Sequence, residues 1–327
     1  MSGGGAGREP SFGDARGPVM LGVESLALTD GDRARLANAR VGGVILFARN
    51  FESSTQLARL TREIRTVRPS LLIAVDHEGG RVQRFRTDGF SSIPPMRSLG
   101  ERWDHAPGDA TAEAAAHGET IARELRAHGV DFSFTPVLDL DYGVSAVIGN
   151  RAFHADPIIV ADLAAALLRG LATGGCAGVG KHFPGHGFVS ADSHVDTPVD
   201  PRSLDDLLRT DIVPFAALMQ SGLAAIMPAH VVYPAVDDRP AGFSRIWITD
   251  ILRGRFAFDG LVFSDDLEMA GAHSAGDIVS RADAALEAGC DTVLVCNDFD
   301  AMDTLLARWS PPSEPHLARR WTRMVGR

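Results

Sequence analysis

Eight short apolar segments are spread along the chain, and glycine, proline, aspartate or asparagine bounds each of them. Most are continuous apolar runs rather than alternations of apolar and polar residues, as is typical of strands buried on both faces of a parallel sheet. We therefore expect parallel strands at VMLGV (19–23), GGVILFA (42–48), LLIAVD (71–76), FSFTPVLDL (132–140), AGVGKHF (177–183), AAIMPAH (224–230), LVFSDD (261–266) and DTVLVCN (291–297).

Segments with helical periodicity and capping residues lie between these runs. After Ser54, for example, Leu57, Leu60 and Ile64 recur at i, i+3 and i+7. Further helices are expected at 111–128, 156–173, 204–219 and 278–288, and from Thr249 onward. Such alternation favours a single (β/α)8 TIM barrel over residues 18–327, preceded by a disordered tail at residues 1–17. An open doubly wound sheet would show the same alternation, but no GxGxxG or P-loop follows the first strand.

Composition limits the partners and the compartment. The formal net charge of −10 argues against binding to nucleic acid or to an anionic membrane surface. No run approaches the roughly 18 apolar residues that span a bilayer, and the first residues do not resemble a signal peptide. Cys176, Cys290 and Cys296 form no CxxC pair, which favours reduced thiols. We expect a cytoplasmic protein without nucleic-acid or membrane partners.

Polar residues follow six of the expected strands. In a barrel of this kind the carboxyl ends of the strands meet at one rim, and the active site lies there. One such aspartate would be uninformative, because aspartate often caps the next helix, whereas convergence of six polar strand ends indicates a small-molecule enzyme site. The residues are Asp76, Asp139, Asp141, Lys181, His182, His230, Asp265, Asp266 and Asn297.

Two motifs offer groups suited to a sugar. In VDHEGGRVQRF (75–85), Asp76 can accept hydrogen bonds from two hydroxyls, and Arg84 can donate a fork of hydrogen bonds. The alternative for this motif is a glycine turn with a solvated cluster of charges. In VIGNRAF (147–153), Arg151 stands between apolar neighbours and equally suits a loop-bracing role.

KHFPGHG (181–187) contains the only lysine of the chain, Lys181, beside His182. Successive side chains of a strand point to opposite faces, so both reach one ligand only if the strand bends or ends there. Pro184 and Gly185 suit such a break, and His186 is interpreted as a loop-stabilising residue.

Two further motifs offer groups for proton transfer and for attack. In ADSH (191–194), Asp192 can fix the tautomer of His194 and leave its other nitrogen for proton transfer. In FSDDLEMAG (263–271), Asp265 continues the strand into the barrel mouth, and Asp266 caps or braces the following turn.

Taken in this order, DHEGGRVQR, VIGNRAF, KHFPGHG, DSH and SDDLEM resemble the motifs of the family 3 glycoside hydrolases. Over residues 19–300 the sequence is most similar to the bacterial single-domain β-N-acetylhexosaminidase branch that recycles cell-wall muropeptides. His77 departs from the glutamine usual in this branch, and Asn150 departs from its aspartate.

The resemblance implies a retaining exo-β-N-acetylglucosaminidase that forms a covalent glycosyl-aspartate intermediate. It assigns Asp265 as the nucleophile, His194 as the general acid/base and Asp192 as the partner of His194. The implied substrate is a small carbohydrate of the N-acetylglucosaminyl-anhydromuramyl type, and we expect a monomer without a metal or organic cofactor. The implied sugar-binding residues are Asp76, Arg84, Arg151, Lys181 and His182.

Other functions remain open at this point. Another β-glycosidase of the same family would use the same catalytic groups. A β-glycoside phosphorylase would also use them, but phosphate would attack in place of water. The protein could also be a non-catalytic sugar sensor, but such a sensor would not need the two proposed catalytic groups, Asp265 and His194. A metal-dependent barrel hydrolase would bind zinc through His182, His186, His194 and Asp265, although the first strand has no HxH pair.

Overall fold

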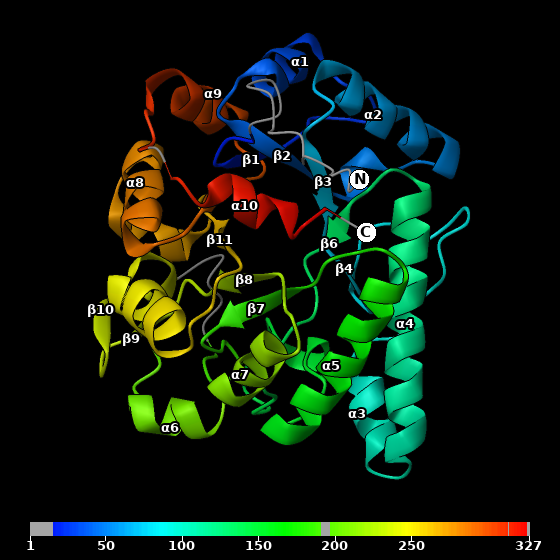
Figure 1. Ribbon diagram of the computed structural model, residues 1–327, viewed down its shortest axis with the longest axis vertical. Coiled ribbons are helices and arrows are strands. Elements are labelled where there is room, and N and C mark those ends of the chain that lie inside the picture. Colours follow the sequence, from blue (N-terminus) through cyan, green and yellow to red (C-terminus); the bar gives the residue numbers. More distant parts are fainter. Residues whose placement is uncertain (1–15, 191–196, 313, 326–327) are drawn as a thin grey trace, which may run out of the picture.

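Eight parallel strands form the centre of the molecule in the computed structural model, which describes residues 16–190, 197–312 and 314–325 (Figure 1). They pair in the order β6-β3-β2-β1-β12-β11-β8-β7. Each falls within or overlaps one of the eight predicted runs, so that prediction is confirmed. The strands are β1 (Val19–Gly22), β2 (Val41–Leu46), β3 (Leu72–Val75), β6 (Phe132–Ser133), β7 (Val179–Phe183), β8 (Ala225–Pro228), β11 (Leu261–Asp266) and β12 (Thr292–Val295).

The sheet closes on itself between its first and last strands. Beyond the end of β6, Val137 forms a parallel bridge with Lys181 of β7. The amide of Leu138 donates to the carbonyl of Lys181 at 2.7 Å, and the amide of Val179 donates to the carbonyl of Thr135 at 2.8 Å. An open doubly wound sheet has two free edges, whereas this one is joined, so the (β/α)8 barrel is confirmed.

Helices surround the strands, and α4 and α5 lie side by side along one flank (Figure 1). The segment 204–219, expected as one helix, is two, because the chain turns at Thr210, where the backbone leaves the helical region. The helices are α1 (Asp30–Ala37), α2 (Ser54–Val67), α3 (Arg97–Trp103), α4 (Pro107–Ala127), α5 (Pro157–Thr173), α6 (Leu204–Arg209), α7 (Ile212–Gln220), the π-helix η5 (Ile246–Arg255), α8 (Ile278–Ala288), α9 (Phe299–Arg308) and α10 (Leu317–Thr322).

Shorter elements decorate the connections after the strands. None of the helices in the described ranges has the length and apolarity that a bilayer crossing needs. The additional strands form two hairpins, β4 (His77–Gly79) with β5 (Val82–Gln83) and β9 (Val232–Tyr233) with β10 (Asp237–Pro240). The short 3₁₀ helices are η2 (Ala48–Asn50), η3 (Gly149–Arg151), η4 (Ala241–Phe243) and η6 (Ala270–Ala275).

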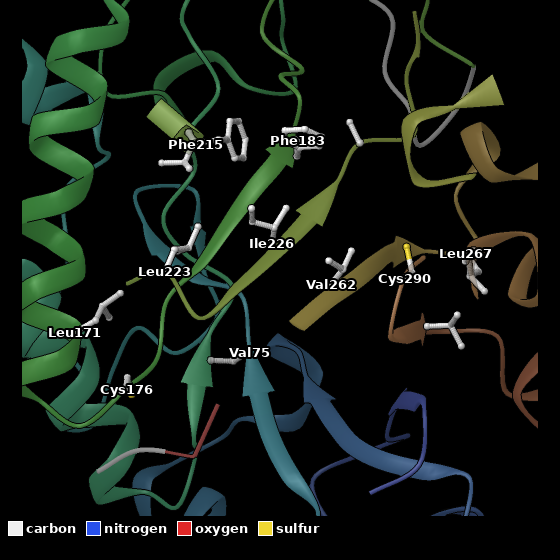
Figure 2. Packing of buried hydrophobic residues seen from close by; sticks show 14 of the residues in the cluster. Val75, Leu171, Cys176, Phe183, Phe215, Leu223, Ile226, Val262, Leu267 and Cys290 are labelled. Atoms are coloured by element: carbon white, nitrogen blue, oxygen red, sulfur yellow. The ribbon is translucent and has the colours of Figure 1, made fainter. Parts of the chain in front are cut away.

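The strands bury apolar side chains on both faces. In β1, Val19 and Leu21 join the apolar layer between strands and helices, while Met20 joins a second cluster that fills the barrel. Figure 2 shows the outer layer, in which the rings of Phe183 and Phe215 lie 5.3 Å apart. This two-sided burial explains why the strand sequences are continuous apolar runs.

Helix α10 closes the barrel at the end where the strands begin. The ring of Trp321 lies 5.8 Å from that of Phe263, and Leu317 and Met324 belong to the same interior cluster. The opposite end, at the carboxyl ends of the strands, is left to polar side chains.

His77 is buried in an aromatic cluster at the start of β4. Its ring lies 5.8 Å from that of Phe85 and 5.7 Å from that of Phe90, and the residue is 0% exposed. Within the described part of the chain, neither ring nitrogen has a hydrogen-bond partner. Burial, and to a lesser extent the nearby Arg86, lowers the pKa of His77 to about 3.

We predict that His77→Gln makes stability less sensitive to acid. The unfolded chain binds this proton near pH 6.5, whereas the folded chain binds it only near pH 3, so the contribution of His77 is lost as the pH falls below 6.5. Between about pH 6 and pH 4, the wild type should lose about 1.4 kcal/mol more of its unfolding free energy per pH unit than the variant. Urea unfolding across this range measures the difference. The exposed His105→Gln is the control, and equal slopes for His77→Gln and the wild type would contradict the prediction.

Candidate active site

A cavity of about 570 Å³ opens at the carboxyl ends of the barrel strands. Six of the eight site residues predicted from the sequence line it. Apolar walls are provided by residues such as Phe47, Phe134 and Met269. The six residues are Asp76, Arg84, Arg151, Lys181, His182 and Asp265.

A second cavity of about 490 Å³ lies between α5 and the C-terminal segment. Small residues line most of it, together with Arg169 and Arg323. It contains none of the predicted site residues, so the cavity at the carboxyl ends of the strands is the candidate active site.

Charged side chains in and behind this cavity alternate in sign along a continuous chain. The ammonium of Lys181 lies 2.8 Å from Oδ1 of Asp76 and 2.7 Å from Oε1 of Glu78. Asp76 continues the chain to Arg84 at 3.3 Å, and Glu78 continues it to Arg151 at 2.8 Å. The order is therefore Arg151, Glu78, Lys181, Asp76, Arg84.

The alternation keeps these buried groups ionised. Burial alone would lower the pKa of Lys181, but Asp76 and Glu78 raise it above its ordinary value. Burial would likewise raise the pKa of Glu78, yet Arg151 and Lys181 hold it well below its usual range. Lys181 and Arg84 hold the pKa of Asp76 below its usual range against the same effect of burial. The cavity therefore presents fixed charges, which suit the recognition of several hydroxyl groups.

Asp139 orients His182 from behind the cavity. Its pKa is lowered despite burial, chiefly by His182, so it accepts hydrogen bonds. Nδ1 of His182 donates to Oδ2 of Asp139 at 2.7 Å, and the amide of His186 donates to Oδ1 at 2.7 Å. These hydrogen bonds to Asp139 fix the orientation of the His182 ring. The bond between Lys181 and His182 is a cis peptide, and both side chains line the cavity.

Asp265 and Asp266 differ in environment although they are adjacent in β11. Oδ1 of Asp265 accepts the amide of Asp266 at 2.8 Å. Asp266 accepts the amide of Glu268 at 3.1 Å, so its expected role in bracing the turn is confirmed. Burial, with smaller contributions from Glu268 and Asp265, raises the pKa of Asp266 well above its usual range. The environment of Asp266 therefore disfavours its charged form.

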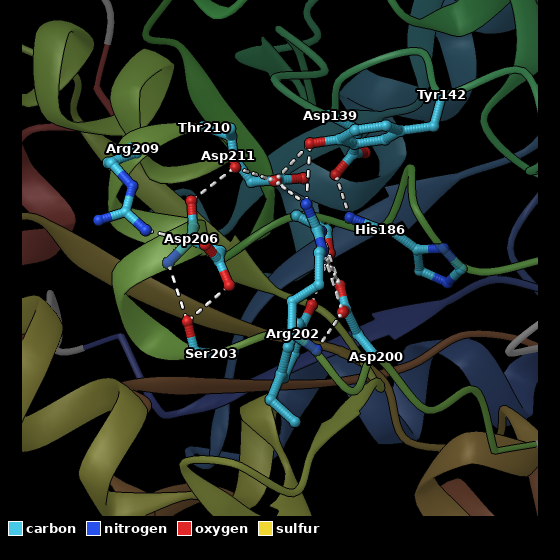
Figure 3. Close-up of polar contacts among 12 residues, drawn as sticks. Asp139, Tyr142, His186, Asp200, Arg202, Ser203, Asp206, Arg209, Thr210 and Asp211 are labelled. Carbon is cyan, nitrogen blue, oxygen red and sulfur yellow. Dashed lines mark hydrogen bonds and ion pairs between the residues drawn. The ribbon is translucent and has the colours of Figure 1, made fainter.

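Asp192 and His194 lie outside the described residues. The residues on either side of this segment are joined by Arg202, whose guanidinium lies 4.2 Å from the centre of the Phe188 ring. Arg202 also forms ion pairs with Asp200 at 2.6 Å and Asp211 at 2.7 Å (Figure 3). Phe188 and Asp200 are thus held in one network on the two sides of residues 191–196.

Of the other residues singled out in the sequence, some line the cavity and some do not. His186 is buried and lines the cavity, while its amide stabilises Asp139. Neither His77 nor Asn150, the two residues that depart from the motifs of the family, lines the cavity. Over the residues that the structure describes, no group of three or more His, Cys, Asp or Glu side chains is arranged to hold a metal ion. The proposed zinc set included His194, which lies outside those residues.

The sequence motifs predict no specific role for two residues at this site. Asp139 is one of the polar strand ends, and Glu78 is one of the charged residues of VDHEGGRVQRF (75–85). In the sequence, each is only a carboxylate in or beside a buried strand. Its role becomes clear once its partners on other elements are known.

Comparison with known proteins identifies the family. The model of the glycosyl hydrolase family 3 N-terminal domain matches residues 19–315. The chain belongs to glycosyl hydrolase family 3. It is therefore a glycoside hydrolase, as the resemblance implied.

The family 3 relatives cover nearly the whole chain. A β-hexosaminidase of Chromobacterium violaceum is 58% identical over 95% of this chain and 87% of its own length. A β-hexosaminidase of Bordetella avium is 60% identical over 93% of this chain and 87% of its own length. The crystal structure of native NagZ from Neisseria gonorrhoeae superposes with a TM-score of 0.91 at 52% identity, covering 95% of this chain and 90% of that one. The same gonococcal protein has been solved with N-trifluoroacetyl-D-glucosamine and with a zinc ion.

We predict that Asp139→Asn lowers kcat/KM about 10- to 100-fold. The amide loses the charge that fixes His182, and a hydrogen bond to a charged group contributes about 1.5–3 kcal/mol. Steady-state kinetics on an aryl β-N-acetylglucosaminide measures this. The matched control is Asp141→Asn, because Asp141 pairs with Arg97 outside the cavity, and its effect should stay below about fivefold. Equal kinetics for Asp139→Asn and Asp141→Asn would refute the role of Asp139.

Proposed function

We propose that the protein is a retaining exo-β-N-acetylglucosaminidase that removes terminal β-linked N-acetylglucosamine from muropeptide-type substrates. The observation that carries the proposal is the position of Asp265 in a cavity that also holds Asp76, Arg84, Arg151, Lys181 and His182. The identity of the family 3 relatives as β-hexosaminidases supports the type of linkage and sugar. The gonococcal complex with an N-acylated glucosamine supports a glucosamine-type ligand.

In the proposed complex, the charge chain binds the hydroxyls of the terminal sugar. Asp76 accepts hydrogen bonds through lone pairs not used by Lys181 and Arg84. Lys181 and Arg151 donate hydrogen bonds, and His182 presents its ring to the sugar. These groups are fixed before the sugar arrives, so little ordering is needed on binding.

The proposed reaction has two steps. In the first, a carboxylate oxygen of Asp265 attacks the anomeric carbon, the glycosidic bond breaks, and His194 donates a proton to the leaving oxygen. In the second, His194 removes a proton from water, which attacks the same carbon and releases Asp265. Asp192 would fix the tautomer of His194 throughout. A histidine serves both steps because its unperturbed pKa lies near about 6.5.

The proposal also includes the compartment and the partners. The three cysteines are unpaired and buried, which is compatible with the reducing cytoplasm. We propose a cytoplasmic monomer whose partner is a small N-acetylglucosaminyl-anhydromuramyl substrate, with no metal or organic cofactor in the reaction.

We predict that a 5-fluoro glycoside of N-acetylglucosamine labels Asp265. Fluorine slows the second step, so the glycosyl ester accumulates and is located by peptide mass spectrometry. Asp265→Asn should not be labelled, and its kcat should fall on the order of 1,000-fold or more. The control Asp266→Asn should stay within about tenfold, because the asparagine oxygen can still accept the hydrogen bond from the amide of Glu268. A label on another residue would assign the nucleophile elsewhere.

We predict that N-acetylglucosaminyl-anhydromuramic acid releases free N-acetylglucosamine in phosphate buffer. A glycosyl phosphate would instead indicate a phosphorylase of the same family. Activity that is lost after exhaustive chelation, and restored by zinc, would favour the metal-dependent alternative. Chromatography of the products with and without phosphate distinguishes these outcomes.

A further inference from the structure

Glu78 lies behind the cavity wall and contacts two of the residues that form it. Its side chain is 2% exposed, and it is not among the residues that line the cavity. Nε of Arg151 donates to Oε2 at 2.9 Å, and Nη2 donates to Oε1 at 2.8 Å. The ammonium of Lys181 lies 2.7 Å from the same Oε1. One buried carboxylate therefore holds two cations in a fixed relation.

We propose that Glu78 is a positioning residue, which sets the places of Lys181 and Arg151 for sugar binding without touching the sugar. This rests on the proposed function of the cavity. Two cations side by side in a buried wall repel each other, and Arg151 by itself disfavours the charged form of Lys181. The paired hydrogen bonds to Arg151 also fix the plane of the guanidinium, which a single contact would not do.

Glu78 also keeps Arg151 away from the other carboxylates of the site. The charge of Arg151 interacts with Asp139 and Asp76 as well as with Glu78. Without Glu78, the guanidinium of Arg151 would be attracted toward those two carboxylates. Since Asp139 orients His182 and Asp76 faces the cavity, a displaced Arg151 would disturb both. The effect of Glu78 therefore reaches groups that it does not contact.

The backbone around Glu78 is well anchored. Gly79 and Gly80 adopt positive φ angles of 109° and 54°, and the amide of Gly80 donates to the carbonyl of Ile93 at 2.8 Å. A side chain at Gly79 would meet the carbonyl oxygen of Pro94 at 2.6 Å, so glycine permits this close approach. The pairing of β4 with β5 and the hydrogen bond to Ile93 thus hold the backbone that carries the carboxylate.

The test compares Glu78→Gln with Asp131→Asn. Asp131 is also a buried carboxylate with two arginine partners, Arg65 and Arg126, but it precedes β6 at the opposite end of the strands from the cavity. Glu78→Gln should raise the Kd for N-acetylglucosamine and the KM for an aryl N-acetylglucosaminide about tenfold or more. The fall in kcat should be smaller, because Asp265 is untouched. Asp131→Asn should lower the melting temperature and leave Kd and KM unchanged.

A double-mutant cycle then tests whether Glu78 acts through Lys181. The effect of Glu78→Gln on Kd should be at least about threefold smaller in a Lys181→Met background than in the wild type. Additive effects, or a Kd shift in Asp131→Asn equal to that in Glu78→Gln, would overturn the inference. Calorimetry well below the melting temperature measures Kd for every variant.

A conservative variant covers the case in which Glu78→Gln does not fold. Glu78→Asp keeps the buried charge but is one methylene shorter, so it reaches one cation and not both, and its Kd should rise severalfold. A wild-type Kd in Glu78→Asp would contradict the inference even if hydrolysis by the wild type were established. Absence of hydrolysis by the wild type itself would instead count against the proposed function.

Discussion

Lys181 keeps its charge inside the protein because two carboxylates reach it from the segment after β3. An isolated ammonium buried there would lose its proton, because the free energy of removing a charge from water is far larger than the gain from an apolar contact. The pairing joins the end of β7 to β4 and, through Arg151, to the connection after β6. Strands far apart in the chain are thereby linked at the rim where the polar side chains converge, and the geometry of the candidate site follows from this link.

The two ends of the barrel are held by different forces. At the amino end, Trp321 and its apolar neighbours close the interior, and their contribution depends on area removed from water. At the carboxyl end, buried ion pairs such as that between Glu78 and Arg151 hold the chain, and their net contribution to stability is small against the cost of desolvation. The polar end thus gains specific geometry rather than stability, which is what ligand recognition requires.

The sequence predicted the strands well because each is buried on both faces and reads as an apolar run. The turn at Thr210 was not predicted, because Asp211 there is held by Tyr142, 69 residues away, and by Arg202, which precedes the helix. Asp76 and Lys181 were recognised from local motifs. The roles of Asp139 and Glu78 depend on partners 43 and 73 residues away, which only the folded barrel brings into contact.

The single lysine has a consequence for chemical modification of the protein. Lys181 is the only side-chain amine in the sequence, and its ammonium is enclosed by carboxylates. Bulky amine-directed crosslinkers and fluorophores therefore find no lysine on the described surface. A reagent small enough to enter the cavity would meet an amine whose raised pKa keeps it protonated and poorly nucleophilic. Immobilisation or labelling through side chains must therefore use chemistry directed at groups other than amines.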